Sequence, residues 1–260
     1  MRGKDRQSMK KLVIAGGAAI ALAVAGVITA GAAWYFFIRE NAELASDPPE
    51  IPAALLNATA SPTSAASTTG LRATATTAPS ASVTYQVKSN LSEADYFVDE
   101  ELASVGIPST AKGATTEVSG TLYLTGDGAA LAANQTSSVT VQLRNLTSDK
   151  SMRDQRVQQA LETSRYPTAT FTITSASGYN PAIAEGQEQT LQLSGNLQLH
   201  GVTKPVTWEV KAYRQGNVIS ALATVTIKFS DFNITPPTFQ GLLSISDQAT
   251  LQVKLIAQAA

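Results

Sequence analysis

The C-terminal part of the sequence predicts an all-β domain of about eight strands with one short inserted helix. Three observations predict it. From Val83 onward, apolar and polar residues alternate with a period of two. Turn residues such as His200-Gly201 and Gln215-Gly216-Asn217 separate the alternating runs, and residues 148–166 have helical spacing instead. Alternation alone leaves two architectures open, a two-sheet sandwich and a closed antiparallel barrel.

Each expected strand has one apolar and one polar face. In residues 191–200 every second residue is Leu or Gly, whereas Gln, Ser, Asn and His occupy the positions between them. Similar alternation is present in residues 118–124, 138–143, 202–210, 223–229 and 251–255, and after the helix. By this parity we expect the following side chains to point inward: Leu122, Val141, Leu143, Phe171, Ile173, Leu197, Trp208, Val225, Ile227 and Phe229. In a barrel of this size they can either fill the interior or surround one small apolar ligand.

Residues 148–166 predict a helix that lies on the domain. Ser148 or Ser151 can cap its start, and Asp154 follows Ser151 at the spacing of a capping box. The stripe expected to face the domain has i, i+3, i+4 spacing and consists of Val157, Ala160 and Leu161. We expect Tyr166-Pro167 to end the helix, because the α conformation is disfavoured for a residue that precedes proline.

The N-terminal end predicts insertion into a membrane. Residues 12–38 carry no charge, and about 20 predominantly apolar residues suffice to span a bilayer. Basic residues dominate residues 1–11 and acidic residues follow residue 39, which places the N-terminus in the cytoplasm and the rest outside. We expect an uncleaved signal anchor rather than a cleaved signal peptide, because the apolar run is longer than a signal-peptide core and continues through Trp34-Tyr35.

Residues 39–82 predict a disordered linker. Ala, Ser, Thr and Pro dominate this segment and no apolar period persists, so it cannot bury enough surface to offset the entropy of ordering. The expected organisation is a basic cytoplasmic terminus (1–11), a transmembrane anchor (12–38), this linker (39–82) and an extracytoplasmic β-domain (83–260). The sequence thus predicts a single-pass protein of the cell membrane.

The composition argues against several functions. The chain has no cysteine, one histidine and a formal net charge of -1. It therefore lacks thiolate ligands, a His-rich metal site and the basic stripe that binds nucleic acid. His200 lies between a strand and a glycine, where a turn residue is ordinary, and no nucleophile motif accompanies it. We expect a protein that is not an enzyme, with no metal, no cofactor and no nucleic-acid partner.

Several motifs, in order along the chain, resemble those of the YceI-like family. They are LTSD at residues 146–149 with Arg153-Asp154, YPTATF at 166–171, LHGVTKPVTW at 199–208, KFSDF at 228–232 and SDQATL at 246–251. The resemblance implies a lipocalin-like, antiparallel, eight-stranded barrel with a helix inserted mid-chain. It also implies that the barrel interior binds a long apolar molecule, such as an isoprenoid quinone, a polyprenyl compound or another long-chain lipid.

This resemblance makes the inward side chains named above candidates for ligand binding. It implies mainly architectural roles for Arg153-Asp154 and for the turn at residues 200–203. Arg153 at the barrel mouth is also a candidate contact for an anionic head group, because guanidinium suits phosphate. Where many members carry a His-Ser pair in an early strand, this chain has EADYFVDE at residues 93–100.

Three hypotheses of function follow. The first is a membrane-anchored extracytoplasmic binding protein that holds an isoprenoid or other long-chain lipid in the barrel interior. The alternative is a structural or interaction module displayed at the surface, with no small ligand. The third is a hydrolase or isomerase that acts on the bound lipid through His200 or Asp231.

Overall fold

The structure is a computed structural model that describes residues 42–57, 82–102, 107–126, 128–180, 182–237 and 242–260. The predicted transmembrane anchor at residues 12–38 lies outside the described residues. Within the described ranges, no helix is both long enough and apolar enough to cross a membrane.

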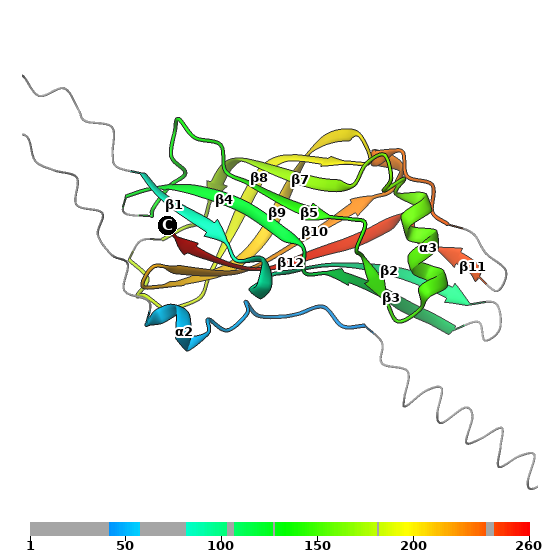
Figure 1. Cartoon of the computed structure of the whole chain (residues 1–260), viewed down its shortest axis with the longest axis horizontal. Helices are drawn as coiled ribbons and strands as arrows, with labels where there is room; N and C mark the ends of the chain where they lie inside the picture. The colour runs from blue at the N-terminus through cyan, green and yellow to red at the C-terminus, as the bar shows by residue number, and fades with distance from the viewer. Residues whose placement is uncertain (1–41, 58–81, 103–106, 127, 181, 238–241) are drawn as a thin grey trace, which may run out of the picture. The chain divides into compact units, whose positions relative to one another are not determined.

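Eight antiparallel strands form a closed barrel (Figure 1). In order around the barrel they are β1 (Ser82–Val87), β4 (Val118–Thr125), β5 (Ser138–Gln142), β7 (Thr168–Ser177), β8 (Gln189–Leu199), β9 (Val202–Gln215), β10 (Val218–Lys228) and β12 (Gln248–Ala259). Pairing of β12 with β1, with Tyr85 opposite Ala259, closes the circuit. The predicted all-β class with one short helix is confirmed, and closure decides for the barrel over the sandwich, because all eight strands are hydrogen-bonded on both sides.

Four further strands extend the wall at one end of the barrel. They are β2 (Glu93–Leu102), β3 (Ile107–Thr115), β6 (Thr147–Ser148) and β11 (Leu242–Ile245). Because β12 is long, residues 257–259 pair with β1 whereas residues 250–254 pair with β2. The short 3-10 helix η1 (Ser89–Leu91) separates β1 from β2. The wall therefore continues from β12 through β2, β3 and β6 toward the inserted helix.

The inserted helix α3 (Ser151–Ala160) lies at this same end of the barrel (Figure 1). The predicted capping box is wrong: the N-cap is Lys150, and Asp154 Oδ1 instead accepts hydrogen bonds from the Ser148 N–H (2.8 Å) and Oγ (2.6 Å). The predicted end at Tyr166-Pro167 is also wrong. The helix ends at Ala160, because Glu162 has a positive φ of 44° that an α-helix cannot accommodate.

Residues 42–57, which we call the strap, lie along the outside of the barrel and include the short helix α2 (Ala53–Leu56) (Figure 1). Ile51 is 6% exposed and packs in a cluster with Val218 of β10 and Ile256 of β12. The prediction of a disordered linker is therefore wrong for residues 42–57, because this part buries an apolar side chain and bonds its backbone to the barrel. Residues 58–81 of that predicted linker lie outside the described residues.

Side chains of the barrel bind the strap backbone. The Gln252 side chain accepts from the Ala45 N–H (2.8 Å) and donates to the Ala45 carbonyl (2.9 Å). The Tyr213 hydroxyl accepts from the Ile51 N–H (3.2 Å) and donates to the Pro49 carbonyl (3.1 Å). A second buried cluster thus lies outside the barrel wall, in addition to the core inside it.

Candidate ligand-binding cavity

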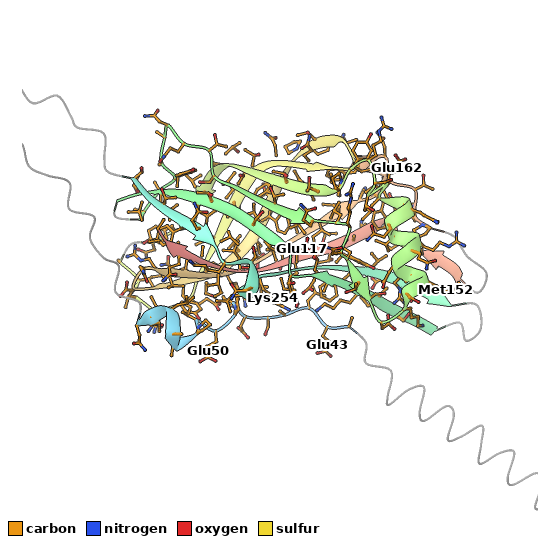
Figure 2. The ribbon with its side chains drawn as sticks, viewed as in Figure 1. Glu43, Glu50, Glu117, Met152, Glu162 and Lys254 are labelled. Atoms are coloured by element: carbon orange, nitrogen blue, oxygen red, sulfur yellow. The ribbon has the colours of Figure 1, made fainter. Side chains whose placement is uncertain are left out.

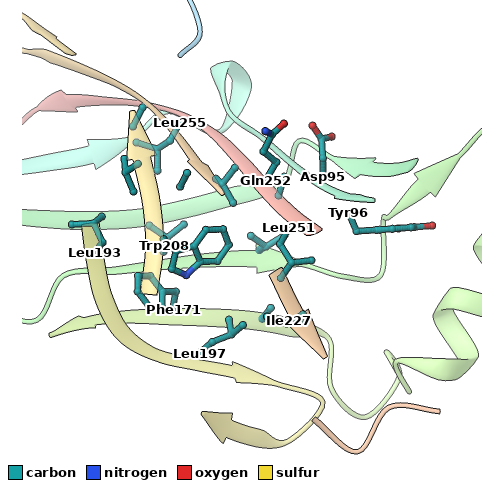
Figure 3. Close-up of a pocket in the computed structure, with 18 of the residues that line it drawn as sticks. Asp95, Tyr96, Phe171, Leu193, Leu197, Trp208, Ile227, Leu251, Gln252 and Leu255 are labelled. Carbon is teal, nitrogen blue, oxygen red and sulfur yellow. The ribbon is translucent and has the colours of Figure 1, made fainter. Parts of the chain in front are cut away.

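A cavity of about 610 Å³ runs through the barrel interior. Its wall consists mainly of apolar side chains that alternate inward along the strands, as Figure 3 shows for Trp208, Phe171, Leu197 and Ile227. The lining reaches from α3 and the Pro236-Pro237 segment at one mouth to residues 183–185 and Arg214 at the other. The inward faces therefore surround an open space rather than a solid core.

All the predicted binding residues except Val225 line this cavity. Val225 packs against the core cluster, but it lines a different hollow, which it shares with Lys204 and Val206. The stripe of α3 also faces the cavity, through Val157, Ala160 and Leu161. The inward positions of these residues agree with the alternation of the sequence. Their contact with a ligand stays a prediction.

Small inward residues, which the sequence analysis missed, make the space. Ala169, Ala212, Ala221 and Ala223 line the cavity where larger side chains would fill it. The sequence did contain a signal for them, because these alanines alternate in phase with the inward apolar residues of their strands. The inward residues of β2, among them Ala94, Tyr96 and Val98, were missed because their strand is interrupted by acidic residues.

Trp208 is the central aromatic side chain of the wall. Its ring is tilted by 52° against that of Phe171, with 5.7 Å between the centroids. Gly195 on the neighbouring strand leaves room for this pair, since a Cβ there would lie 2.8 Å from Phe171 Cε2 and would overlap the Thr172 carbonyl oxygen. The Trp208 Nε1–H is buried and has no hydrogen-bond partner among the described residues.

An ion pair lies at the α3 mouth. Arg153 Nη2 is 2.8 Å from Glu100 Oε1, and the side chains are 11% and 5% exposed. Arg153 also pairs with Asp149, one helical turn earlier. Burial raises the pKa of the adjacent Tyr96 to about 12. Because two carboxylates already neutralise the Arg153 guanidinium, this arrangement favours the architectural role predicted for Arg153 over a head-group contact.

The surroundings of His200 are those of a residue with a structural role. It has a positive φ of 51° in the turn between β8 and β9, and its Nδ1 lies 3.0 Å from the Phe232 carbonyl oxygen. Its ring packs edge-on against Tyr166, with 5.1 Å between the centroids. Neither His200 nor Asp231 is among the described residues that line the cavity, so the candidates for lipid chemistry lie outside it.

The described residues thus form a closed antiparallel barrel of eight strands with an apolar interior and a helix beside one mouth, which is the class of β-barrel that can hold one small ligand. A model of the YceI-like domain family matches residues 85–257, which is more than half of the chain. The chain therefore belongs to the YceI-like family.

Relatives of known sequence and structure agree with this assignment. The chain is 38% identical over 105 residues to Protein YceI of Salmonella arizonae and of Salmonella newport, which covers 37% of this chain and 51% of each relative. The matched part thus spans about half the length of these curated relatives. The fold is similar to that of a polyisoprenoid binding domain from Saccharophagus degradans implicated in plant cell wall breakdown, with a TM-score of 0.51 and 18% identity over 68% of this chain and 98% of that chain.

Proposed function

We propose that this protein is a membrane-anchored, extracytoplasmic binding protein that holds one isoprenoid or other long-chain lipid inside its barrel. The observation that carries the proposal is the apolar cavity of about 610 Å³. Its volume lies within the roughly 300–1,000 Å³ typical of small-molecule sites. Its course from one mouth to the other suits an elongated molecule more than a compact one.

The chemistry of the wall supports an apolar ligand with a small polar group. Leu, Ile, Val and Ala side chains supply most of the lining, and burial of a hydrocarbon chain against them gains about 25 cal/mol per Å² of apolar surface. The unpartnered Nε1–H of Trp208 would gain a hydrogen bond from an acceptor such as a quinone or phosphate oxygen. The ligand of the Saccharophagus degradans domain, a polyisoprenoid, belongs to the same chemical class.

The anchoring part of the proposal rests on the sequence of residues 1–38. A basic N-terminus followed by an uncharged apolar run is typical of a signal anchor whose downstream domain is exported. Confinement near a bilayer would raise the local concentration of any lipid ligand that partitions into it.

Native mass spectrometry of the full chain, released from detergent micelles, tests ligand binding. We expect one bound molecule per chain with the mass of an isoprenoid or other long-chain lipid. The variant Ala223→Phe, which places a large side chain in the cavity, should lose this adduct. Gln198→Phe is the matched control: Gln198 is exposed on the outer face of β8, so this variant should keep the adduct.

The interaction module remains the competing hypothesis. It predicts a wild-type chain without a stoichiometric adduct, even after incubation with a long-chain quinone or a polyprenyl phosphate. Equal adducts in Ala223→Phe and wild type would also contradict the proposal, because a ligand outside the cavity would not respond to its filling.

A further inference from the structure

One cation in the cavity wall is not neutralised by a carboxylate. Among the described residues, the charged side chains that line the cavity are Asp95, Glu100, Arg153, Arg156, Glu185 and Arg214. Asp95 lies 3.2 Å from both Lys112 and Lys254. Glu100 pairs with Arg153 at 2.8 Å, and Glu185 lies 3.8 Å from Arg214. Within the described part of the chain, Arg156 is therefore the lining charge that has no ion-pair partner.

The sequence of α3 explains why Arg156 is unpaired. Side chains three or four positions apart are neighbours on a helix surface, and those at these distances from Arg156 include no acid: Met152, Arg153, Gln159 and Ala160. Arg153 differs in this respect, because Asp149 lies four residues before it and pairs with it. The helix thus supplies a partner for the first arginine and none for the second.

The acidic residues around α3 are also bound elsewhere. Figure 2 shows Glu162 at the same end of the barrel as Met152 of α3. In residues 148–166 each acidic side chain contacts a group other than Arg156: Asp149 binds Arg153, Asp154 binds Ser148, and Glu162 lies 3.9 Å from Arg165. The guanidinium of Arg156 is therefore available to an anion from outside the chain.

A charged head group is favoured at a mouth of the cavity rather than in its middle. Transfer of an ion into apolar surroundings is strongly unfavourable, and the interior is lined mainly by Leu, Ile, Val and Ala side chains. Arg156 is exposed to solvent and also lines the cavity. At this rim a lipid can keep its charged end in water while its hydrocarbon chain lies inside.

The two mouths differ in the charge of their lining. At the α3 mouth the charges of Glu100 and Arg153 cancel, which leaves the positive charge of Arg156. Asp149 also contacts Arg153, but its side chain is 67% exposed and does not line the cavity. At the other mouth Glu185 and Arg214 neutralise each other. An anionic group is therefore attracted to the α3 mouth.

A guanidinium distinguishes an oxyanion from a neutral polar group. It can donate two parallel N–H bonds to the oxygens of a phosphate or a carboxylate, and these bonds are strengthened by charge. A hydroxyl group or a ketone offers one uncharged oxygen. Arg156 should therefore favour an anionic lipid over a neutral lipid with the same hydrocarbon chain.

We propose that Arg156 selects a long-chain lipid with a phosphate or carboxylate head group and holds this head group at the α3 mouth, while the chain lies in the cavity. The inference rests on the lipid binding proposed above and deepens it. It names the charge of the head group, and it gives the lipid a direction inside the barrel. The head-group contact falls to Arg156 instead of Arg153, whose charge is already neutralised.

Competition in native mass spectrometry of the full chain, released from detergent micelles, tests this selection. After removal of bound lipid, the chain receives equal amounts of geranylgeranyl phosphate and geranylgeraniol, which differ only in the head group. Wild type should bind the phosphate with a preference of about fivefold, the effect of an ion pair that is partly open to water. Arg156→Gln should lose this preference. Arg156→Lys, which keeps the charge without the planar fork, should show an intermediate value.

Arg165→Gln is the matched control. It removes the same charge from an exposed arginine that does not line the cavity, so the preference for the phosphate should remain. A preference that is unchanged in Arg156→Gln, or that falls equally in both variants, would overturn the inference. Excess inorganic phosphate should leave the geranylgeranyl phosphate adduct in place. Displacement by inorganic phosphate would also overturn the inference, because the site would then bind the free anion rather than a lipid head group.

A photoreactive diazirine on the carbon next to the phosphate tests the direction of the lipid. After illumination of the full chain, peptide mass spectrometry should find the label on residues 151–160 of α3. Label on residues 182–189 at the other mouth, in equal or greater amount, would overturn the proposed direction.

Failure of the inference can be distinguished from failure of the proposed function. A wild-type chain that forms no adduct with either the phosphate or the alcohol refutes lipid binding itself. A chain that binds both lipids equally refutes only the selection of an anionic head group by Arg156.

Discussion

Arg153 and Glu100 show how a buried charge is accommodated beside an apolar cavity. The two side chains are 2.8 Å apart and almost inaccessible to water. Removal of charge from water costs several kcal/mol per ion, which the pair offsets by mutual attraction and hydrogen bonds. Together with Asp149, the pair joins α3 to the end of β2 and so holds the rim of one mouth.

Substitution of Arg153 should be costly for this reason. Arg153→Ala leaves the buried Glu100 carboxylate without this guanidinium, and we expect the free energy of unfolding to fall by about 3–5 kcal/mol. Arg165→Ala is the control, because the Arg165–Glu162 pair is exposed and 3.9 Å apart and should contribute less than about 1 kcal/mol. Urea unfolding measures both, and equal losses would mean that Arg153 is not a buried structural charge.

Titration of the Tyr96 phenol should make the free energy of unfolding depend on pH in the alkaline range. Burial raises its pKa from the ordinary value of 10.0 to about 12. A raised pKa means that the folded state favours the protonated phenol. This contribution is complete below pH 10 and is lost as the pH rises toward 12.

The variant Tyr96→Phe isolates this effect. Between pH 9 and pH 11, wild type should lose about 1 kcal/mol more of its free energy of unfolding than the variant does. Urea unfolding at the two pH values gives the comparison, since all other groups titrate in both proteins. Identical losses would show that the Tyr96 phenol titrates normally in the folded state.

At the scale of elements, β7 and β8 approach each other closely at Gly195. A Cβ at this position would overlap the Thr172 carbonyl oxygen and contact the Phe171 ring. We expect Gly195→Ala to lower the free energy of unfolding by about 1–3 kcal/mol, because backbone and a packed ring would both have to shift. Asn196→Ala, at the next, outward-facing position, should change it by less than about 0.5 kcal/mol. Thermal unfolding of both variants measures the contrast, and similar stabilities would contradict the close approach.

The strap shows why two strands have buried residues on their outer faces. Val218, Ser220 and Ile256 alternate with cavity-lining residues and therefore point outward, and the Gln252 side chain binds Ala45 of the strap. Yet each of these four residues is at most 2% exposed. Gln252 and Asp95, which are register partners, point to the opposite side of their strands from Leu251 (Figure 3). The apolar outer positions Val218 and Ile256 were a signal in the sequence that another segment covers this wall.

At the scale of the whole molecule, an open cavity is a loss of packing that a ligand can repair. A ligand that binds only the folded state stabilises it by about 2.7 kcal/mol at a concentration one hundred times its Kd. For a domain of this size we expect the melting temperature to rise by about 5–10 °C. Differential scanning calorimetry with a long-chain quinone checks this prediction, with Gln198→Phe as the responsive control. Ala223→Phe should show no rise, and a rise equal to that of wild type would place the quinone outside the cavity.

Much of the barrel follows from local patterns in the chain. Alternation located β4, β5, β8, β9, β10 and β12, because a strand with one dry and one wet face has a period of two wherever it lies. The same parity placed nearly all the candidate side chains on the cavity wall. It failed at β2, where Asp95 and Glu100 are acidic and yet buried: Asp95 lies 3.2 Å from both Lys112 and Lys254, and Glu100 pairs with Arg153. Those partners are distant in sequence, so no local pattern could indicate them.

The sequence by itself determined the all-β class, the inserted helix, the inward faces and the family, since each depends on residues that are neighbours or on motifs in a fixed order. Only the tertiary structure decided three other features: the closure of β12 on β1, the cavity in the interior, and the docking of residues 42–57 on the outer wall. Closure and docking arise from hydrogen bonds between segments far apart in the chain. The cavity arises because several inward positions carry alanine, among them the cross-strand neighbours Ala212 and Ala221. These are properties of distance in space, which a linear pattern does not encode.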